Sequence, residues 1–338
     1  MKYNYVFFNI REKYKDGFYE ICLRDISKWE NVIITSRYME HAGAVLRFFR
    51  RMCFSKTVNN IVSVPFKKMF YPMYFKNTFK DDKPLCFIFC CHYEDVEYIR
   101  YLREKYPDCR IIKMHRDLIK LWRQKHPAFT EDVIKELFDV VMAYDENEAK
   151  EYDAVHFNEF ESKIDVGRDE KYPIADVFFA GAAKERLPQI MDAYKVLTDA
   201  GLNVLYYLVG VPKQQQGNYP GITYSDKWLP YKKMLYYSVN SRCILEINQG
   251  DSVGYTSRFL EAVIYGKKLI TNNCSIENSP FYNSEYIQCV KNMKDLNPDF
   301  VRKDVGEIDY GYTDQFSPKY LFERIDNMLI DMDENRNR

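Results

Sequence analysis

The sequence lacks a net charge and any long apolar run. Its 338 residues carry 49 Lys and Arg against 49 Asp and Glu, so no overall field attracts nucleic acid or an anionic membrane. No stretch reaches the ~18 consecutive apolar residues of a membrane span, and the opening apolar run is too short and too soon followed by charge for a signal peptide. We therefore expect a cytoplasmic protein without a nucleic-acid partner, in at most peripheral contact with the inner face of a membrane.

Paired cysteines and metal-binding motifs are also missing. The nine cysteines form no CxxC pair and are odd in number, which argues against a disulfide framework and a zinc ribbon and favours buried free thiols. No HExxH occurs, and Asp81 and Asp82 lie in a polar, Lys-flanked segment, so we expect no metal site. Glycine and proline are few, 13 of each, while 46% of residues are apolar. This composition predicts a packed globular protein.

The length exceeds what one hydrophobic core usually serves and favours two domains. Strand-like and helix-like segments alternate through the chain, which is typical of a parallel sheet with crossover helices. A charged, Pro-containing connection near 165–173 predicts the linker. We expect two Rossmann-like α/β domains in tandem with a cleft between them, at 1–165 and 174–316, followed by a closing helix and tail at 317–338.

A turn of small residues follows the strand-like run DVFFA. Gly181 and Ala182 let backbone amides approach an anion, and Lys184 and Arg186 follow at the start of a helix-like stretch. Amides, a helix start and two cations suit phosphate oxygens. A tight turn with solvated charges is an equally good interpretation.

A second segment, GDSVGYTSRFLEAVIYGKKLITNN at 250–273, joins a glycine-containing lead to a helix. Thr256 or Ser257 can cap that helix, and Arg258 and Glu261 lie three apart on one face of its first turns. A carboxylate in this position can accept both hydroxyls of a ribose, while the guanidinium and the amides meet a diphosphate. The alternative is a surface ion pair beside a helix cap.

The order Gly, Tyr, Thr, Ser, Arg, two residues, Glu, Ala, then Gly, Lys and a strand ending in Thr-Asn resembles the nucleotide-binding segment of GT-B glycosyltransferases of bacterial lipopolysaccharide or capsule synthesis. The resemblance implies that Glu261 is the ribose ligand and that Gly181, Ala182 and Lys184 belong to the loop that faces the diphosphate. It also implies a nucleoside diphosphate sugar as donor substrate, with no permanent cofactor and no metal. Arg258 and Lys184 would stabilise the leaving diphosphate, with Arg186 and Lys267 behind them.

One position departs from that family. Many retaining members carry a second Glu eight residues before the first, and Val253 stands there in this chain. Glu246, Asn248 and Asp251 lie near enough to substitute, and the sequence does not choose among them.

The first half offers candidates for a catalytic base. His92 follows the strand-like CFIFCC, and Asp117 follows RIIKM; an inverting enzyme needs such a group to take the acceptor proton. Asp117 is the first choice and His92 the second. Alternatively Asp117 caps a helix and His92 is a histidine with its hydrogen bonds satisfied at a strand end.

We expect a glycosyltransferase acting on a hydroxyl of a growing surface glycan or a lipid-linked acceptor. An amphipathic stretch with Arg47, Arg50, Arg51 and Lys56 beside Phe48 and Phe49 could contact anionic lipid, although the pattern alone favours a helix with one solvated basic side. A sugar-nucleotide epimerase of the same two-lobed fold and a non-catalytic sugar-binding module are the alternatives.

Overall fold

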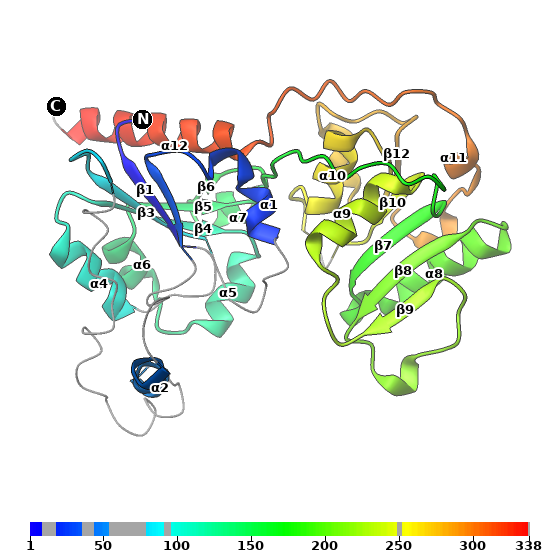
Figure 1. Cartoon of the computed structure of the whole chain (residues 1–338), viewed down its shortest axis with the longest axis horizontal. Coiled ribbons are helices and arrows are strands. Elements are labelled where there is room, and N and C mark those ends of the chain that lie inside the picture. The colour runs from blue at the N-terminus through cyan, green and yellow to red at the C-terminus, as the bar shows by residue number, and fades with distance from the viewer. Residues whose placement is uncertain (9–17, 36–43, 54–78, 91–95, 249–251, 337–338) are drawn as a thin grey trace.

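The computed structural model describes residues 1–8, 18–35, 44–53, 79–90, 96–248 and 252–336. Two six-stranded sheets organise these residues, each made of parallel pairs only. Figure 1 shows the two sheets side by side, each with its own helices. Two Rossmann-like domains in tandem, the arrangement of the GT-B fold, are therefore confirmed; we call them the first and the second domain.

The first domain has the strand order β2-β1-β3-β4-β5-β6. Its strands are β1 (Asn4–Phe8), β2 (Val32–Thr35), β3 (Leu85–Phe89), β4 (Arg110–His115), β5 (Val140–Ala143) and β6 (Val155–His156). Its helices are α1 (Phe18–Cys22), α2 (Ala44–Cys53), α4 (Val96–Lys105), α5 (Ile119–Lys125), α6 (Glu131–Leu137) and α7 (Glu146–Glu151).

The second domain has the strand order β12-β11-β10-β7-β8-β9. Its strands are β7 (Val177–Ala182), β8 (Val204–Val209), β9 (Ile222–Ser225), β10 (Cys243–Glu246), β11 (Lys268–Thr271) and β12 (Ile287–Cys289). The helices of this half are α8 (Leu187–Asp199), α9 (Tyr231–Asn240), α10 (Ser257–Tyr265) and α11 (Asp299–Arg302), followed by α12 (Pro318–Arg336).

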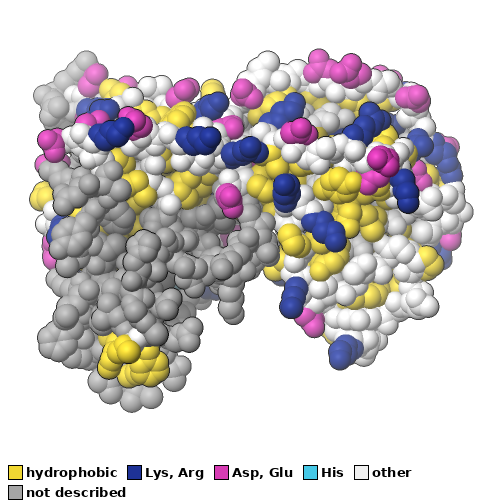
Figure 2. All heavy atoms as spheres, viewed as in Figure 1, with side chains coloured by type: hydrophobic (Ala, Val, Ile, Leu, Met, Phe, Trp, Pro, Cys, Tyr) yellow, Lys and Arg dark blue, Asp and Glu magenta, His cyan; other side chains and the backbone are white. Residues whose placement is uncertain are grey.

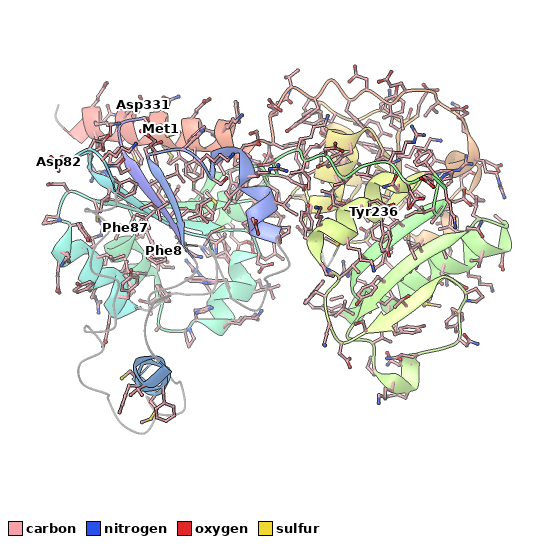
Figure 3. The ribbon with its side chains drawn as sticks, viewed as in Figure 1. Met1, Phe8, Asp82, Phe87, Tyr236 and Asp331 are labelled. Carbon is pink, nitrogen blue, oxygen red and sulfur yellow. The ribbon has the colours of Figure 1, made fainter. Side chains whose placement is uncertain are left out.

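The central strands β1 and β3 are buried along their whole length because side chains pack on both faces of the sheet. Every residue of β1 and β3 is buried, as expected for parallel strands inside an α/β domain. Phe8 and Phe87, on these two neighbouring strands, have ring centroids 6.1 Å apart (Figure 3). Apolar side chains on adjacent strands thus form a continuous core on each face of the sheet.

The C-terminal helix α12 returns to the first domain (Figure 1). Leu321, Phe322, Ile325 and Leu329 belong to the same buried cluster as residues of β1. The rings of Phe322 and Tyr5 meet edge to face with centroids 5.3 Å apart. The expected closing helix therefore completes the first domain's core, after a connection that starts in the second domain.

The cysteines that the structure describes are free thiols, and six of them are buried. Cys91 lies outside the described residues. Since no disulfide links the described cysteines, packing and hydrogen bonds hold the two domains together.

Helix α2 presents a stripe of exposed apolar side chains. Val45, Phe48, Phe49 and Met52 are between 43% and 70% exposed and follow one another at the spacing of one helical face. Figure 2 shows an apolar patch at the place of α2. The side chains of Arg47, Arg50 and Arg51, and Lys56 as a whole, lie outside the described part of the chain.

No helix among the described residues is long and apolar enough to cross a membrane.

Candidate active site

The second sheet reverses its strand order between β7 and β10. The chain builds outward from β7 through β8 to β9, and then places β10, β11 and β12 on the other side of β7. In open parallel sheets, ligands bind beyond the carboxyl ends of the two strands at such a switch point. The sequence analysis selected two segments: Gly181 to Lys184 spans the carboxyl end of β7, and Thr256 to Glu261 comes after β10.

The first segment differs in detail from the expected turn. Gly181 and Ala182 are the last two residues of β7, because they continue its pairing with Leu208 and Val209 of β8. The turn comes one residue later, where Lys184 takes a φ of 42° and starts a short 3₁₀ helix. Lys184 is exposed beyond the strand end, as an anion-binding lysine should be.

Arg186 joins the two strand ends instead of facing solvent. Its Nη1 donates to the carbonyl of Ile247 at 2.5 Å, and its Nη2 donates to the carbonyl of Ala182. A Cβ on Gly181 would lie 3.2 Å from that Nη2, so the glycine leaves room for the guanidinium. Burial lowers the pKa of Arg186. Its contacts fix the geometry of the switch point, a role that the sequence did not reveal.

The second segment forms helix α10 as expected. Thr256 is the N-cap, and its Oγ1 accepts from the backbone amide of Arg258 at 3.1 Å. Ser257 is the first helical residue, and Gly266 ends the helix with a φ of 60°. The N-terminal turn of α10 therefore begins beside the carboxyl end of β10, where the partial positive charge of a helix start favours an anion.

Glu261 is fully buried, with 0% of its surface exposed. Its Oε1 accepts from the hydroxyl of Tyr231 at 3.2 Å, and its Oε2 accepts from the hydroxyl of Ser238 at 2.6 Å and from the guanidinium of Arg258. Burial raises the pKa of Glu261, while Arg258, Ser238 and Tyr231 lower it. Both oxygens thus have partners inside the protein, and a ribose hydroxyl could reach them only by replacing one.

Of the three possible substitutes for the missing glutamate, two are described. Glu246 ends β10, is 2% exposed and accepts from the hydroxyls of Thr256 and Thr271. Asn248 donates from Nδ2 to the carbonyl of Ser252 at 3.2 Å. Asp251 lies outside the described residues. Glu246 therefore helps to orient the N-cap of α10.

Asp117 lies beyond the carboxyl end of β4 and is exposed. The alternative reading of Asp117 as a helix cap is wrong, because the N-cap of α5 is Leu118, without a side-chain cap. Glu148 of α7 accepts instead from the amides of Ile119 and Lys120. His92, the second candidate base, lies outside the described residues.

The contact between the domains involves residues that the sequence analysis did not select. Tyr144 and Asp145 follow β5 in the first domain. The Asp145 carboxylate accepts from the hydroxyl of Ser252 at 3.2 Å and from the amides of Val253 and Gly254 at 2.9 and 3.3 Å. The position of Asp145, two residues after the end of β5, is the signal that could have found it, because ligands and domain contacts gather at the carboxyl ends of parallel strands.

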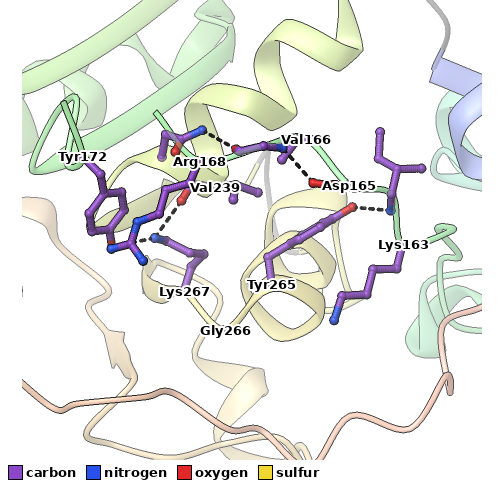
Figure 4. A pocket seen from close by; sticks show the side chains of 12 residues that line it. Lys163, Asp165, Val166, Arg168, Tyr172, Val239, Tyr265, Gly266 and Lys267 are labelled. Carbon is purple, nitrogen blue, oxygen red and sulfur yellow. Dashed lines mark hydrogen bonds between the residues drawn. The ribbon is translucent and has the colours of Figure 1, made fainter. Parts of the chain in front are cut away.

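A cavity of about 690 Å³ lies near the amino ends of β10 and β11, at the opposite ends of these strands from the switch point (Figure 4). Lys267, which precedes β11, donates there to the carbonyl of Val239 at 2.9 Å and to the hydroxyl of Tyr172 at 3.1 Å. The guanidinium of Arg168 lies 4.1 Å from the centre of the Tyr172 ring. Lys267 therefore binds the C-terminal end of α9 and the Tyr172 hydroxyl, and Arg168 packs on the Tyr172 ring, away from the switch point. Lys267 is therefore distant from the proposed diphosphate.

Among the described residues, no group of three or more His, Cys, Asp or Glu side chains could hold a metal ion.

No protein-family model matches the chain, and no curated protein matches its sequence. Solved structures of similar fold include a UDP-N-acetylglucosamine 2-epimerase from Rickettsia bellii, at 12% identity over 99% of this chain and 98% of that one, with a TM-score of 0.46. Anabaena HepE in complex with UDP-glucose is 9% identical over 88% of each chain, with a TM-score of 0.49. A UDP-forming trehalose-phosphate synthase from Burkholderia xenovorans is 11% identical over 89% and 90%, with a TM-score of 0.48. The likeness at these identities is one of fold.

Proposed function

We propose that the chain is a glycosyltransferase that moves a sugar from a nucleoside diphosphate sugar to a hydroxyl of a growing bacterial surface glycan. The observation that carries this proposal is the meeting of the two selected segments at the switch point between β7 and β10. The two segments are some 75 residues apart in the sequence, and both lie at strand ends of the kind where open parallel sheets bind ligands. This position supports the proposal that they bind a sugar nucleotide together.

The donor would lie across the ends of these two strands. Lys184 and Arg258 are the cations proposed for the diphosphate, together with the amides of Thr256 and Ser257. Glu261 is proposed for the ribose hydroxyls, with one internal hydrogen bond exchanged for one to the ribose. Positioning and stabilisation of the departing diphosphate would supply most of the rate, because the nucleotide leaves with a developing negative charge.

The acceptor would approach from the first domain. Asp117, exposed beyond β4, and His92 are the proposed bases for the acceptor hydroxyl. Lipopolysaccharide or capsule is the proposed product class, and it rests on the sequence resemblance.

The apolar stripe of α2 supports a lipid-linked acceptor at a membrane surface. Four exposed apolar side chains stand on a ten-residue helix whose sequence contains three arginines and no acidic residue. Such a helix can lie in the headgroup region of an anionic bilayer. Co-sedimentation with vesicles containing anionic lipid should fall in the double variant Phe48→Ser, Phe49→Ser, and binding equal to wild type would remove the membrane from the proposal.

Product analysis tests the reaction itself. The protein is incubated with UDP-, GDP-, ADP- and CDP-sugars, with and without bacterial glycan acceptors, and products are separated by mass and by stereochemistry. A glycosyltransferase releases nucleoside diphosphate in step with an acceptor heavier by one sugar. An epimerase converts one free sugar nucleotide into another without an acceptor, and a binding module changes neither.

A further inference from the structure

The connection between the two domains carries a buried acid. Glu161, between β6 and β7, is 1% exposed. Its amide donates to the carbonyl of Phe316 at 2.8 Å, and the amide and hydroxyl of Ser162 both donate to the carbonyl of Cys22 at 3.2 and 3.0 Å. These bonds fix the backbone at Glu161 and Ser162 within the connection between the domains.

One oxygen of this carboxyl lacks a partner. Among the residues that the structure describes, none forms a hydrogen bond with Oε1 of Glu161. Leaving a buried acceptor unsatisfied is costly, and native proteins rarely retain one without a reason. The carboxyl is therefore a candidate for a proton or for a changing hydrogen bond.

The groups around Glu161 come from several elements. Besides Glu159 in the same connection, they are Glu261, Arg258 and Tyr265 of α10, Tyr231 of α9, Arg116 beyond β4, Cys22 of α1 and Tyr312 before α12. Arg116 is paired with Glu159, and Arg258 with Glu261. Glu161 lies near both of these ion pairs and belongs to neither.

Burial, with the nearby charge of Glu261, raises the pKa of Glu161 to about 8, although Tyr231, Arg258 and Arg116 lower it. The carboxyl therefore holds a proton at neutral pH. Burial also raises the pKa of Tyr231, with both carboxylates adding to the effect. The tyrosine keeps its single hydroxyl proton, which it can donate to only one carboxylate at a time.

We propose that Glu161 is a positioning residue that determines whether the Tyr231 hydroxyl is donated to Glu261 or turned away from it. The Tyr231 hydroxyl lies within hydrogen-bonding reach of both carboxyls, and its contact with Oε1 of Glu261 is 3.2 Å. With Glu161 neutral, Tyr231 donates to Glu261. With Glu161 ionised, the hydroxyl turns to the new carboxylate. Oε1 of Glu261 is then vacant for a ribose hydroxyl, while Ser238 and Arg258 still hold Oε2.

This inference rests on the proposed function, because it assigns the ribose to Glu261. Its consequence is that donor binding releases the Glu161 proton to solvent. By linkage, the affinity for the donor rises as the pH rises toward and through 8. One hydrogen bond to a carboxylate corresponds to roughly a tenfold change in affinity.

Two variants give opposite results if the inference holds. Glu161→Gln is neutral at every pH, so we expect the weak affinity of the low-pH wild type from pH 6 to 9. Tyr231→Phe leaves Oε1 of Glu261 vacant at every pH, so we expect the tighter affinity throughout. Tyr265→Phe is the matched control, because its hydroxyl accepts from the amide of Ile164 at 3.0 Å, whereas the hydroxyl that donates to Glu261 is that of Tyr231; its pH profile should follow wild type.

The measurement is calorimetric titration of the full chain with the nucleotide that binds it, at pH 6, 7, 8 and 9 and in buffers of different ionisation enthalpy. Proton release in wild type below pH 8, absent in Glu161→Gln and in Tyr231→Phe, supports the inference. Binding without proton release in wild type, or equal pH profiles in all variants, overturns it, and the wild-type result decides even if a variant does not fold. If no nucleotide binds to wild type at any pH, it is the proposed function that fails.

Discussion

Asp145 accepts a hydrogen bond from the backbone amide of Val253 at 2.9 Å, across the boundary between the two domains. The same carboxylate caps α7 with its other oxygen, which accepts from the amides of Asn147 and Glu148 at 3.1 Å each. One buried side chain, 2% exposed, thus fixes a helix of the first domain and the loop that leads into α10 of the second. Any separation of the domains must break the hydrogen bonds that Asp145 accepts from the amides of Val253 and Gly254.

Asp145→Asn should separate these two roles. The amide carbonyl can still cap α7, but the NH₂ group cannot accept from the amides of Val253 and Gly254. We expect hydrogen exchange in residues 252–256 to accelerate at least tenfold, because hydrogen bonds to a charged group are worth about 1.5 to 3 kcal/mol. Exchange in residues 146–151 serves as the internal control. Equal acceleration in both segments would mean that the variant has only lost its helix cap.

Gly254→Ala should force the domains apart. An added Cβ would lie 2.6 Å from Cδ2 of Tyr144 and 2.8 Å from its backbone carbonyl oxygen, and backbone cannot yield as a flexible side chain can. We expect a larger radius of gyration in small-angle X-ray scattering. Ser252→Ala, which removes a hydroxyl from the same contact without adding an atom, should leave the radius unchanged. An unchanged radius in Gly254→Ala would show that this contact does not determine the domain spacing.

The C-terminal helix should be required for the stability of the first domain. Phe322 is 0% exposed and packs against Tyr5 and Phe7, so Phe322→Ala should lower the free energy of unfolding by about 3 to 5 kcal/mol. Tyr320 lies on the same helix and is 55% exposed. Tyr320→Ala should change stability by at most about 0.5 kcal/mol in urea unfolding. Similar losses in both variants would refute the assignment of α12 to the core.

Asp333 of α12 should make the stability of the fold depend on pH in the acid range. Burial alone would raise its pKa, but hydrogen bonds from Lys2, Tyr3 and Arg110 outweigh it and hold the pKa well below the usual range. A carboxyl whose pKa is lower in the folded state stabilises the fold above its unfolded pKa of about 3.9, and this contribution is lost as the pH falls through the folded value. Asp333→Asn should therefore be less stable than wild type by about 1 to 3 kcal/mol at pH 7. The difference should shrink as the pH falls from 4 toward 2; a difference independent of pH would contradict the ion pairing.

The features that the sequence predicted are those that local rules determine. The ends of α10 follow from a capping threonine and a C-cap glycine with a positive φ, both of which act within one helical turn. The strand β3 follows from an unbroken apolar run. The switch point itself became visible only with the strand order, which no local pattern specifies.

The features that were missed depend on contacts between distant residues. Asp145 and Val253 are 108 positions apart, and Glu161 comes near Glu261 and Tyr231 although both are distant in the sequence. The sequence showed Arg186 and Glu261 as charges free for a ligand. In the fold, Arg186 holds two backbone carbonyls and Glu261 is surrounded by three donors.

Calorimetric titration with a panel of nucleoside diphosphates and their sugars, on wild type, Lys184→Ala and Lys195→Ala, tests the central claim most directly. Both lysines are exposed in the second domain, Lys184 beyond β7 and Lys195 on the outer surface of α8. We predict that one nucleotide binds wild type and Lys195→Ala equally, and binds Lys184→Ala roughly tenfold more weakly, since one charge-assisted contact is worth about 1.4 kcal/mol or more. Binding of no nucleotide, or equal binding to all three proteins, would contradict a donor site at the ends of β7 and β10.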